Sequence, residues 1–116
     1  MEERPWGFFE ILAETDNFKV KRILVRPGHR LSLQRHKQRR EHWFVLTGEV
    51  LATLDGGEQL LRAGQSVDIP VMALHRMSNQ GVAEATIIEI QTGTYFGEDD
   101  IERITDDYQR EDCSSA

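Results

Sequence analysis

Four side chains in this sequence carry the donor atoms that metal ions prefer: Gln34, His36, Glu41 and His75. Gln34 and His36 are two residues apart in an apolar stretch, and residues two apart on a strand point to the same face. Glu41 follows a short basic loop, and His75 begins a short strand-like segment after Pro70. Imidazole nitrogens with carboxylate and amide oxygens suit a divalent first-row metal ion. The pattern predicts a metal site formed by donors that lie far apart in the chain.

Each of these residues also has an ordinary explanation when it is taken alone. His36 and His75 could be core or surface histidines, and Gln34 by itself is a weak ligand. Glu41 opens the apolar run 43–46, and a carboxylate there is costly inside a barrel unless a cation pairs with it. The joint spacing of the four residues, framed by glycines, favours the metal site over four separate explanations.

The two stretches have spacings that resemble a known pair of motifs. They read Gly28-x5-Gln34-x-His36-x4-Glu41-x6-Gly48 and Gly64-x5-Pro70-x4-His75-x3-Asn79. This pair resembles the two motifs of the cupin superfamily, whose members are small β-barrels with a metal inside. The usual first motif has His where Gln34 stands, and the usual second has Gly where Met72 stands. The glutamine is similar to that of the phosphomannose isomerases, whose ligands are Gln, His, Glu and His.

Further short motifs extend the resemblance along roughly residues 4–110. They look like the C-terminal isomerase domain of type II phosphomannose isomerase/mannose-1-phosphate guanylyltransferase. In chain order they are Arg4-Pro-Trp-Gly, Phe18-Lys-Val-Lys-Arg, Leu31-Ser-Leu-Gln-x-His, Glu41-His-Trp, Ile69-Pro, His75-Arg and Ile88-Glu-Ile-Gln-Thr-Gly-x-Tyr-x-Gly-Glu-Asp-Asp-Ile. The sequence contains no Gly-rich nucleotide loop, so we expect a free-standing isomerase domain.

The resemblance implies interconversion of mannose 6-phosphate and fructose 6-phosphate through a cis-enediol. It implies one divalent ion, Zn, Mn, Co or Ni, on Gln34, His36, Glu41 and His75. A metal acts in such a reaction as a Lewis acid that stabilises the enediolate charge. The resemblance also implies a homodimer.

Three further residue types supply candidates for catalysis and phosphate binding. Glu89 lies on one face of a predicted strand, and that face meets either solvent or the cavity; in the second case Glu89 is our candidate for moving the proton. Arg103 and Arg110 are candidates for catalysis and for the phosphate, because a guanidinium fork suits that anion. Lys21 matches a family position and is a candidate for substrate binding. Gln109 replaces the family's usual glycine before Arg110.

Two other functions fit the same residues. One is a cupin that binds a sugar phosphate and regulates without turnover. The other is a metal-dependent cupin oxygenase, which usually has three histidines or two histidines and one carboxylate around Fe(II). Gln34 in place of a histidine argues against the oxygenase.

The segments that must position these residues are short and strand-like. Alternating apolar patterns predict strands at residues 7–13, 18–25, 31–34, 42–47, 49–54, 58–62, 65–69, 75–78 and 85–91. Residues 98–108 are expected to form a short helix or turn. Many short strands at close spacing predict one all-β domain over residues 1–116, a jelly-roll barrel with a core at about 4–110 and a frayed tail at 112–116.

Composition narrows the function classes. The chain has 116 residues and a net charge of −6, which argues against general nucleic-acid binding. No apolar run is long enough to span a membrane, and the acidic N-terminus lacks the pattern of a signal peptide. Cys113 is the only cysteine. We therefore expect a cytoplasmic protein. Basic residues around the predicted ligands favour an anionic substrate such as a sugar phosphate; they are Arg35, Lys37, Arg39 and Arg40.

Overall fold

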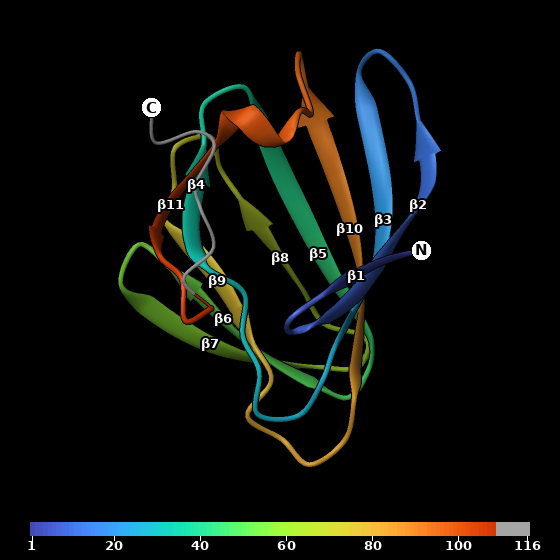
Figure 1. The fold of residues 1–116 in the computed structure, drawn as a ribbon, viewed down its shortest axis with the longest axis vertical. Coiled ribbons are helices and arrows are strands. Elements are labelled where there is room, and N and C mark those ends of the chain that lie inside the picture. Colours follow the sequence, from blue (N-terminus) through green and yellow to red (C-terminus); the bar gives the residue numbers. More distant parts are fainter. Residues whose placement is uncertain (109–116) are drawn as a thin grey trace.

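The computed structural model describes residues 1–108, apart from the side chain of Glu98. This part of the chain forms eleven strands and one 3₁₀ turn, η1 (Figure 1). In chain order these are β1 (Glu2–Arg4), β2 (Gly7–Glu14), β3 (Phe18–Val25), β4 (Leu33–His36), β5 (Arg39–Thr47), β6 (Glu49–Leu54), β7 (Gly57–Arg62), β8 (Ser66–Ile69), β9 (His75–Ser78), β10 (Ala85–Gly93), η1 (Glu98–Asp100) and β11 (Ile101–Thr105).

The strands form two antiparallel sheets that face each other (Figure 1). One sheet has the strand order β1-β2-β3-β10-β5-β8, and the other has the order β11-β4-β9-β6-β7. Most strands that pair within a sheet are distant from each other in the sequence, as a jelly-roll requires. The predicted all-β architecture is confirmed.

One sequence-based expectation needs correction, because residues 98–108 form no more than one turn of helix. The 3₁₀ turn Glu98–Asp100 is followed at once by β11, which pairs with β4. The register between these strands shifts between Arg103 and Thr105, so a bulge interrupts the alternation of side chains. Ile101 is buried and Ile104 is exposed, although three-residue spacing would place both on one face of a helix.

Two turns depend on residues with positive φ. Asp55 and Gly56 have φ angles of 48° and 85° and connect β6 to β7 as a two-residue hairpin, which matches the right-handed twist of the strands. Gly48 joins β5 to β6 at a φ of 78°. A Cβ atom at Gly48 would lie 2.7 Å from the Glu84 carbonyl oxygen, so a side chain there is excluded by close packing as well as by φ.

The inner face of the six-stranded sheet changes from apolar to polar along the barrel. Val25 pairs with Ala85, and the next inward row is Ile23, Ile87 and Val45; all five residues are buried. Burying a Val or Ile side chain contributes about 1.5–3 kcal/mol to stability, so this end anchors the core.

The following inward rows carry functional groups. Lys21, Glu89 and Trp43 form one cross-strand row, and Gln91 pairs with Glu41 in the next. The polar rows lie toward the end of the barrel where β10 ends. The apolar rows thus form a rigid base below a polar chamber.

Candidate metal centre

The five-stranded sheet supplies nitrogen and amide donors from two adjacent strands. β4 places Gln34 and His36 two residues apart, and β9 places His75 directly opposite Gln34. His36 and His75 are both 3% exposed, which shows that they point into the barrel. Glu41 reaches the same place from β5 in the opposite sheet, where it is 4% exposed.

Three of the four predicted ligands meet in one cluster. The His36 Nε2 atom lies 3.0 Å from Glu41 Oε2, and the His75 Nε2 atom lies 3.7 Å from Glu41 Oε1. The centroids of the two imidazole rings are 4.9 Å apart. One donor atom from each residue lies within 4.8 Å of the others, so a single ion can contact all three. This His-Glu-His cluster could hold a metal ion.

The contacts around the cluster also suit a metal. His75 Nδ1 donates to the Ala73 carbonyl oxygen at 2.9 Å, so Nε2 is the ring atom that faces Glu41 and is left for a metal. The Trp43 indole N–H donates to Glu41 Oε1 at 3.0 Å and fixes the carboxylate. Gln34 lines the cavity and donates from Nε2 to Ser32 Oγ at 3.2 Å. Because that bond uses the amide nitrogen, the amide oxygen of Gln34 is the atom that can serve as a fourth metal ligand.

Electrostatics hold the cluster in the protonation state that a metal needs. Burial alone disfavours the charged form of Glu41, but hydrogen bonding to His36 and the nearby His75 and Arg39 outweigh it and hold the pKa of Glu41 well below its usual range. Burial lowers the pKa of His36. An ionised carboxylate and a neutral imidazole are the forms that bind divalent ions.

Arg39 is part of this cluster, and sequence reasoning placed it only in the basic loop. Its Nε and Nη2 atoms each lie 3.2 Å from Glu41 Oε2, and Nη1 donates to the Phe96 carbonyl at 3.2 Å. Arg39 is 4% exposed. The signal was available in the sequence, because Arg39 precedes Glu41 by two residues and so shares its face of β5.

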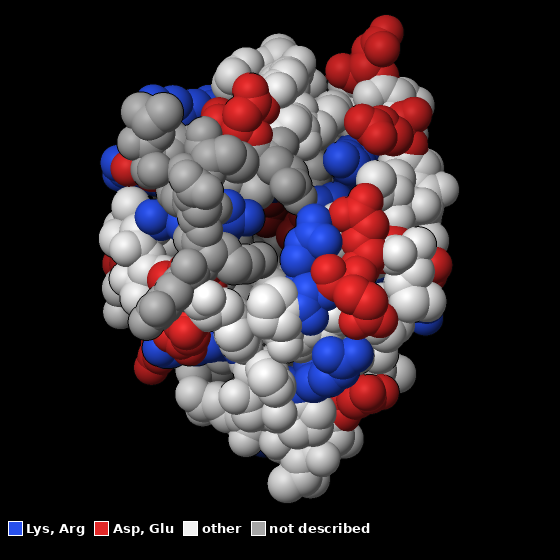
Figure 2. Space-filling view, viewed as in Figure 1, with Lys and Arg blue, Asp and Glu red and all other residues white. Residues whose placement is uncertain are grey.

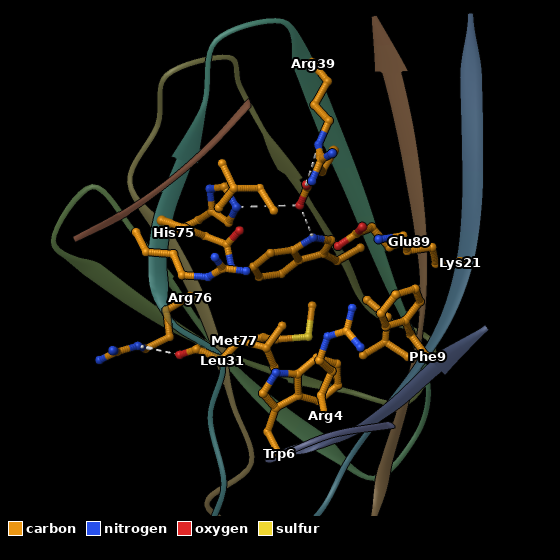
Figure 3. A pocket seen from close by; sticks show the side chains of 16 residues that line it. Arg4, Trp6, Phe9, Lys21, Leu31, Arg39, His75, Arg76, Met77 and Glu89 are labelled. Carbon is orange, nitrogen blue, oxygen red and sulfur yellow. Dashed lines mark hydrogen bonds and ion pairs between the residues drawn. The ribbon is translucent and has the colours of Figure 1, made fainter. Parts of the chain in front are cut away.

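Glu89 and Lys21 lie side by side on the wall formed by the six-stranded sheet (Figure 3). Glu89 is 6% exposed and lines the cavity, so its face does not meet solvent at a sheet edge. Burial and then the charge of Glu41 raise the pKa of Glu89. Burial lowers the pKa of Lys21. A carboxyl with a raised pKa inside a cavity is the kind of group that transfers protons.

Further cations line the same cavity. The Lys21 ammonium lies 4.2 Å from the centroid of the Phe9 ring, and the Arg4 guanidinium carbon lies 4.9 Å from it. Figure 2 shows a hollow with acidic atoms deep inside it and Lys and Arg side chains along its edge. A chamber with a carboxylate interior and a cationic edge suits a ligand that carries both hydroxyl groups and an anionic group.

The remaining arginines of the cavity have different positions. Arg103 on β11 lines the cavity and is the cross-strand partner of Gln34. Arg76 donates from Nε to the Leu31 carbonyl at 2.9 Å and from Nη2 to the Thr105 carbonyl at 3.1 Å. These bonds tie β9 to β11, so Arg76 acts as a brace. Arg110, a predicted catalytic and phosphate-binding residue, lies outside the described residues.

His29 and His42, the two other histidines, lie away from the cluster. His42 faces the outer side of β5, where its Nδ1 lies 2.6 Å from Asp68 Oδ1. The His29 Nδ1 atom lies 2.7 Å from the Tyr108 hydroxyl. His42 points away from Glu41, as strand alternation predicts. No helix among residues 1–108 has the length and apolarity needed to cross a bilayer.

The amino-acid sequence matches one protein family and curated proteins related to it. Residues 2–106 match the family described as "Mannose-6-phosphate isomerase C-terminal". The chain is 48% identical over 107 residues to the alginate biosynthesis protein AlgA of Pseudomonas aeruginosa, covering 92% of this chain and 22% of that protein. It is 45% identical over 107 residues to an Escherichia coli mannose-1-phosphate guanylyltransferase, covering 92% of this chain and 23% of that protein. The chain therefore spans less than a quarter of these curated relatives.

Solved structures agree on the fold. A sugar phosphate isomerase from the cupin superfamily of Silicibacter pomeroyi superposes with a TM-score of 0.62 at 27% identity, over 67% of this chain and 52% of that one. The capsular polysaccharide assembling protein CapF of Staphylococcus aureus gives a TM-score of 0.81 at 20% identity, over 90% of this chain and 32% of that one. The chain therefore has the cupin fold and belongs to the mannose-6-phosphate isomerase C-terminal family.

Proposed function

We propose that this protein is a metal-dependent aldose–ketose isomerase that interconverts mannose 6-phosphate and fructose 6-phosphate. One observation carries the proposal: Glu41 and His75, two members of the His36–Glu41–His75 cluster, line one chamber together with the buried carboxyl of Glu89. An isomerase needs both an electrophile for the sugar oxygens and a base for the neighbouring C–H bond. The family and the sugar phosphate isomerases among its structural relatives support the same class of substrate.

In this proposal Gln34, His36, Glu41 and His75 hold one divalent ion, Zn, Mn, Co or Ni. The ion supplies Lewis-acid stabilisation of the negative charge that develops on the oxygens at C1 and C2. The Trp43 N–H and the Ala73 carbonyl keep Glu41 and His75 in their ligating orientations.

Glu89 is the proposed base for the proton transfer. From aldose to ketose, it takes the proton from C2 and returns it to C1 of the cis-enediol. The hydroxyl proton of O2 passes to O1, so C1 becomes a CH₂OH group and C2 becomes the ketone. A raised pKa suits this role, because the group must both accept and release a proton during one turnover.

The cations at the Phe9 side of the chamber are proposed to bind the phosphate. Lys21 and Arg4 both lie against the Phe9 ring, and Arg103 lies across the chamber on β11. Two of these, Lys21 and Arg103, are sequence candidates, and Arg4 adds a third from β1. Their charges select a phosphorylated sugar over a neutral one.

A homodimer is part of the proposal. Three large apolar side chains, Phe44, Leu46 and Ile90, are between 36% and 42% exposed on β5 and β10. A patch of this kind on a sheet face is suited to association. Sedimentation equilibrium of the full chain measures the mass directly, and a monomer at micromolar concentration contradicts the dimer.

A coupled isomerase assay on the full chain tests the function. We expect turnover of mannose 6-phosphate with an added divalent ion, loss of turnover after chelation, and recovery on metal addition. Unphosphorylated mannose serves as the matched control and is expected to react far more slowly. Turnover by metal-free protein contradicts the Lewis-acid role, and binding of the sugar phosphate without turnover favours a regulatory cupin.

A further inference from the structure

Arg39 occupies the side of Glu41 that faces His36. The guanidinium contacts Glu41 Oε2 twice, and its Nη2 atom lies 3.3 Å from His36 Nε2. Glu41 and His36 both belong to the proposed metal cluster, and Glu41 Oε2 lies 3.0 Å from His36 Nε2. Arg39 is thus a cation that already contacts two of the metal's ligands.

The contacts of His36 Nε2 cannot all persist when an ion binds. Nε2 lies 3.0 Å from Glu41 Oε2 and 3.3 Å from Arg39 Nη2, and a ring nitrogen has either one proton or one lone pair to offer. A metal ion takes that lone pair, so whichever contact Nε2 makes, a proton donated to Glu41 or a bond accepted from Arg39, ends when the ion binds. Glu41 Oε2 is also expected to lose its contact with Arg39 when an ion binds. If one buried carboxylate oxygen contacted both the guanidinium and a divalent ion, two positive charges would lie close together.

We propose that Arg39 is a built-in competitor for the metal site, so that metal uptake is an exchange of one cation for another. This inference rests on the proposed function, since it assumes that His36 and Glu41 ligate an ion. Arg39 acts as a positioning residue: without metal it neutralises Glu41 and keeps the carboxylate aimed at His36. Its bond to the Phe96 carbonyl does not involve Glu41 and gives the side chain an independent anchor during the exchange.

The competition lowers the affinity for metal relative to a site without Arg39. Arg39→Met removes the guanidinium and keeps an unbranched side chain of similar reach. Because charge-assisted hydrogen bonds are strong, we expect the dissociation constant for Co²⁺ or Zn²⁺ to fall about tenfold or more. Arg39→Lys keeps the charge but loses the planar fork, so its affinity should lie between those of the wild type and Arg39→Met.

Calorimetric titration of metal-free full chain with Co²⁺ tests this inference. Arg40→Met is the matched control, because Arg40 is exposed, adjacent and equally charged. Tighter binding by Arg39→Met, with Arg40→Met unchanged, supports the exchange. In thermal melts, Arg39→Met should be less stable than wild type without metal and should gain more stability from metal. Equal or weaker binding by Arg39→Met overturns the exchange alone, whereas absence of binding by both proteins overturns it together with the proposed function.

Discussion

Gln91 donates a hydrogen bond from Nε2 to Oε1 of Glu89 at 2.5 Å, and both side chains are buried on the inner face of β10. They are two residues apart, so the strand directs both side chains to its inner face, where Glu89 lines the chamber. The bond orients the carboxylate and favours its charged form. Gln91 is therefore placed to position Glu89 without contacting the reacting carbons.

Glu89→Gln should lower turnover strongly because it removes the proposed base while keeping the shape of the side chain. General-base removal typically costs about 10²- to 10⁴-fold in rate. We expect a fall in kcat of that size with the bound metal per chain unchanged, as measured by elemental analysis. Glu58→Gln on exposed β7 is the matched control. Turnover equal to wild type removes Glu89 from the mechanism.

The pH profile should show the raised pKa of Glu89. The base works only when it is ionised, so kcat/KM should rise with pH through a limb above the usual 4.5 of a glutamate, because burial and the charge of Glu41 favour the neutral acid. Gln91→Met removes a bond that favours the carboxylate, so the limb should move to higher pH. A limb at or below 4.5, or one that moves to lower pH in Gln91→Met, contradicts this assignment.

The same pKa predicts how stability depends on pH. A carboxyl whose pKa is raised by folding binds its proton more tightly in the folded state, so its contribution to stability is present below pH 4.5 and is lost as pH rises through the folded pKa. Glu89→Gln cannot ionise. Its melting temperature should therefore increase relative to wild type as pH rises above about 4.5, and a constant difference between the two proteins contradicts the prediction.

His36→Ala should abolish tight metal binding while the barrel stays folded. The loss in affinity should exceed the roughly 10- to 100-fold that removal of an outer hydrogen-bond partner costs, because His36 supplies a donor atom of the cluster. His42→Ala is the control, since His42 lies on the outer face beside Asp68. Calorimetric titration with Zn²⁺ and far-ultraviolet circular dichroism measure the two effects. Equal affinities in the two variants rule out His36 as a ligand.

Three strands could be predicted from the sequence to the residue. Predicted and observed bounds agree for Phe18–Val25, Glu49–Leu54 and His75–Ser78. The prediction missed β1, which has only three polar residues and is defined by its pairing with β2. It also missed β11, whose bulge breaks the alternation. Both are edge strands, and tertiary pairing decides their structure more than local preference does.

The site was predictable to the extent that its residues alternate on strands. His36, Glu41 and His75 meet as the spacing suggested, and Glu89 lies in the chamber. Arg39 was missed because residues 37–40 read as a basic loop, whereas β5 begins at Arg39. The two-residue spacing of Arg39 and Glu41 carried the signal, but it applies only because the turn between β4 and β5 is short enough for the strand to begin at Arg39.

That short turn is held by Asp100, which makes it a sensitive point of the fold. Asp100 is 8% exposed and accepts the backbone N–H of Lys37 at 3.2 Å and of Gln38 at 3.0 Å. Asp100→Ala leaves both donors without their charged acceptor, so the free energy of unfolding should fall by about 2 kcal/mol. The melting temperature should then fall by roughly 8–12 °C.

Two further variants separate the role of Asp100 from a general loss of charge. Asp100→Asn keeps one acceptor oxygen and should recover about half of the lost stability, because only one of the two backbone donors is satisfied. Asp16→Ala removes an exposed acid in the turn after β2 and should change stability by less than about 0.5 kcal/mol. Since the turn joins His36 to Arg39, Asp100→Ala should also weaken Zn²⁺ binding. Stability and metal affinity equal to those of Asp16→Ala show that η1 does not position the metal centre.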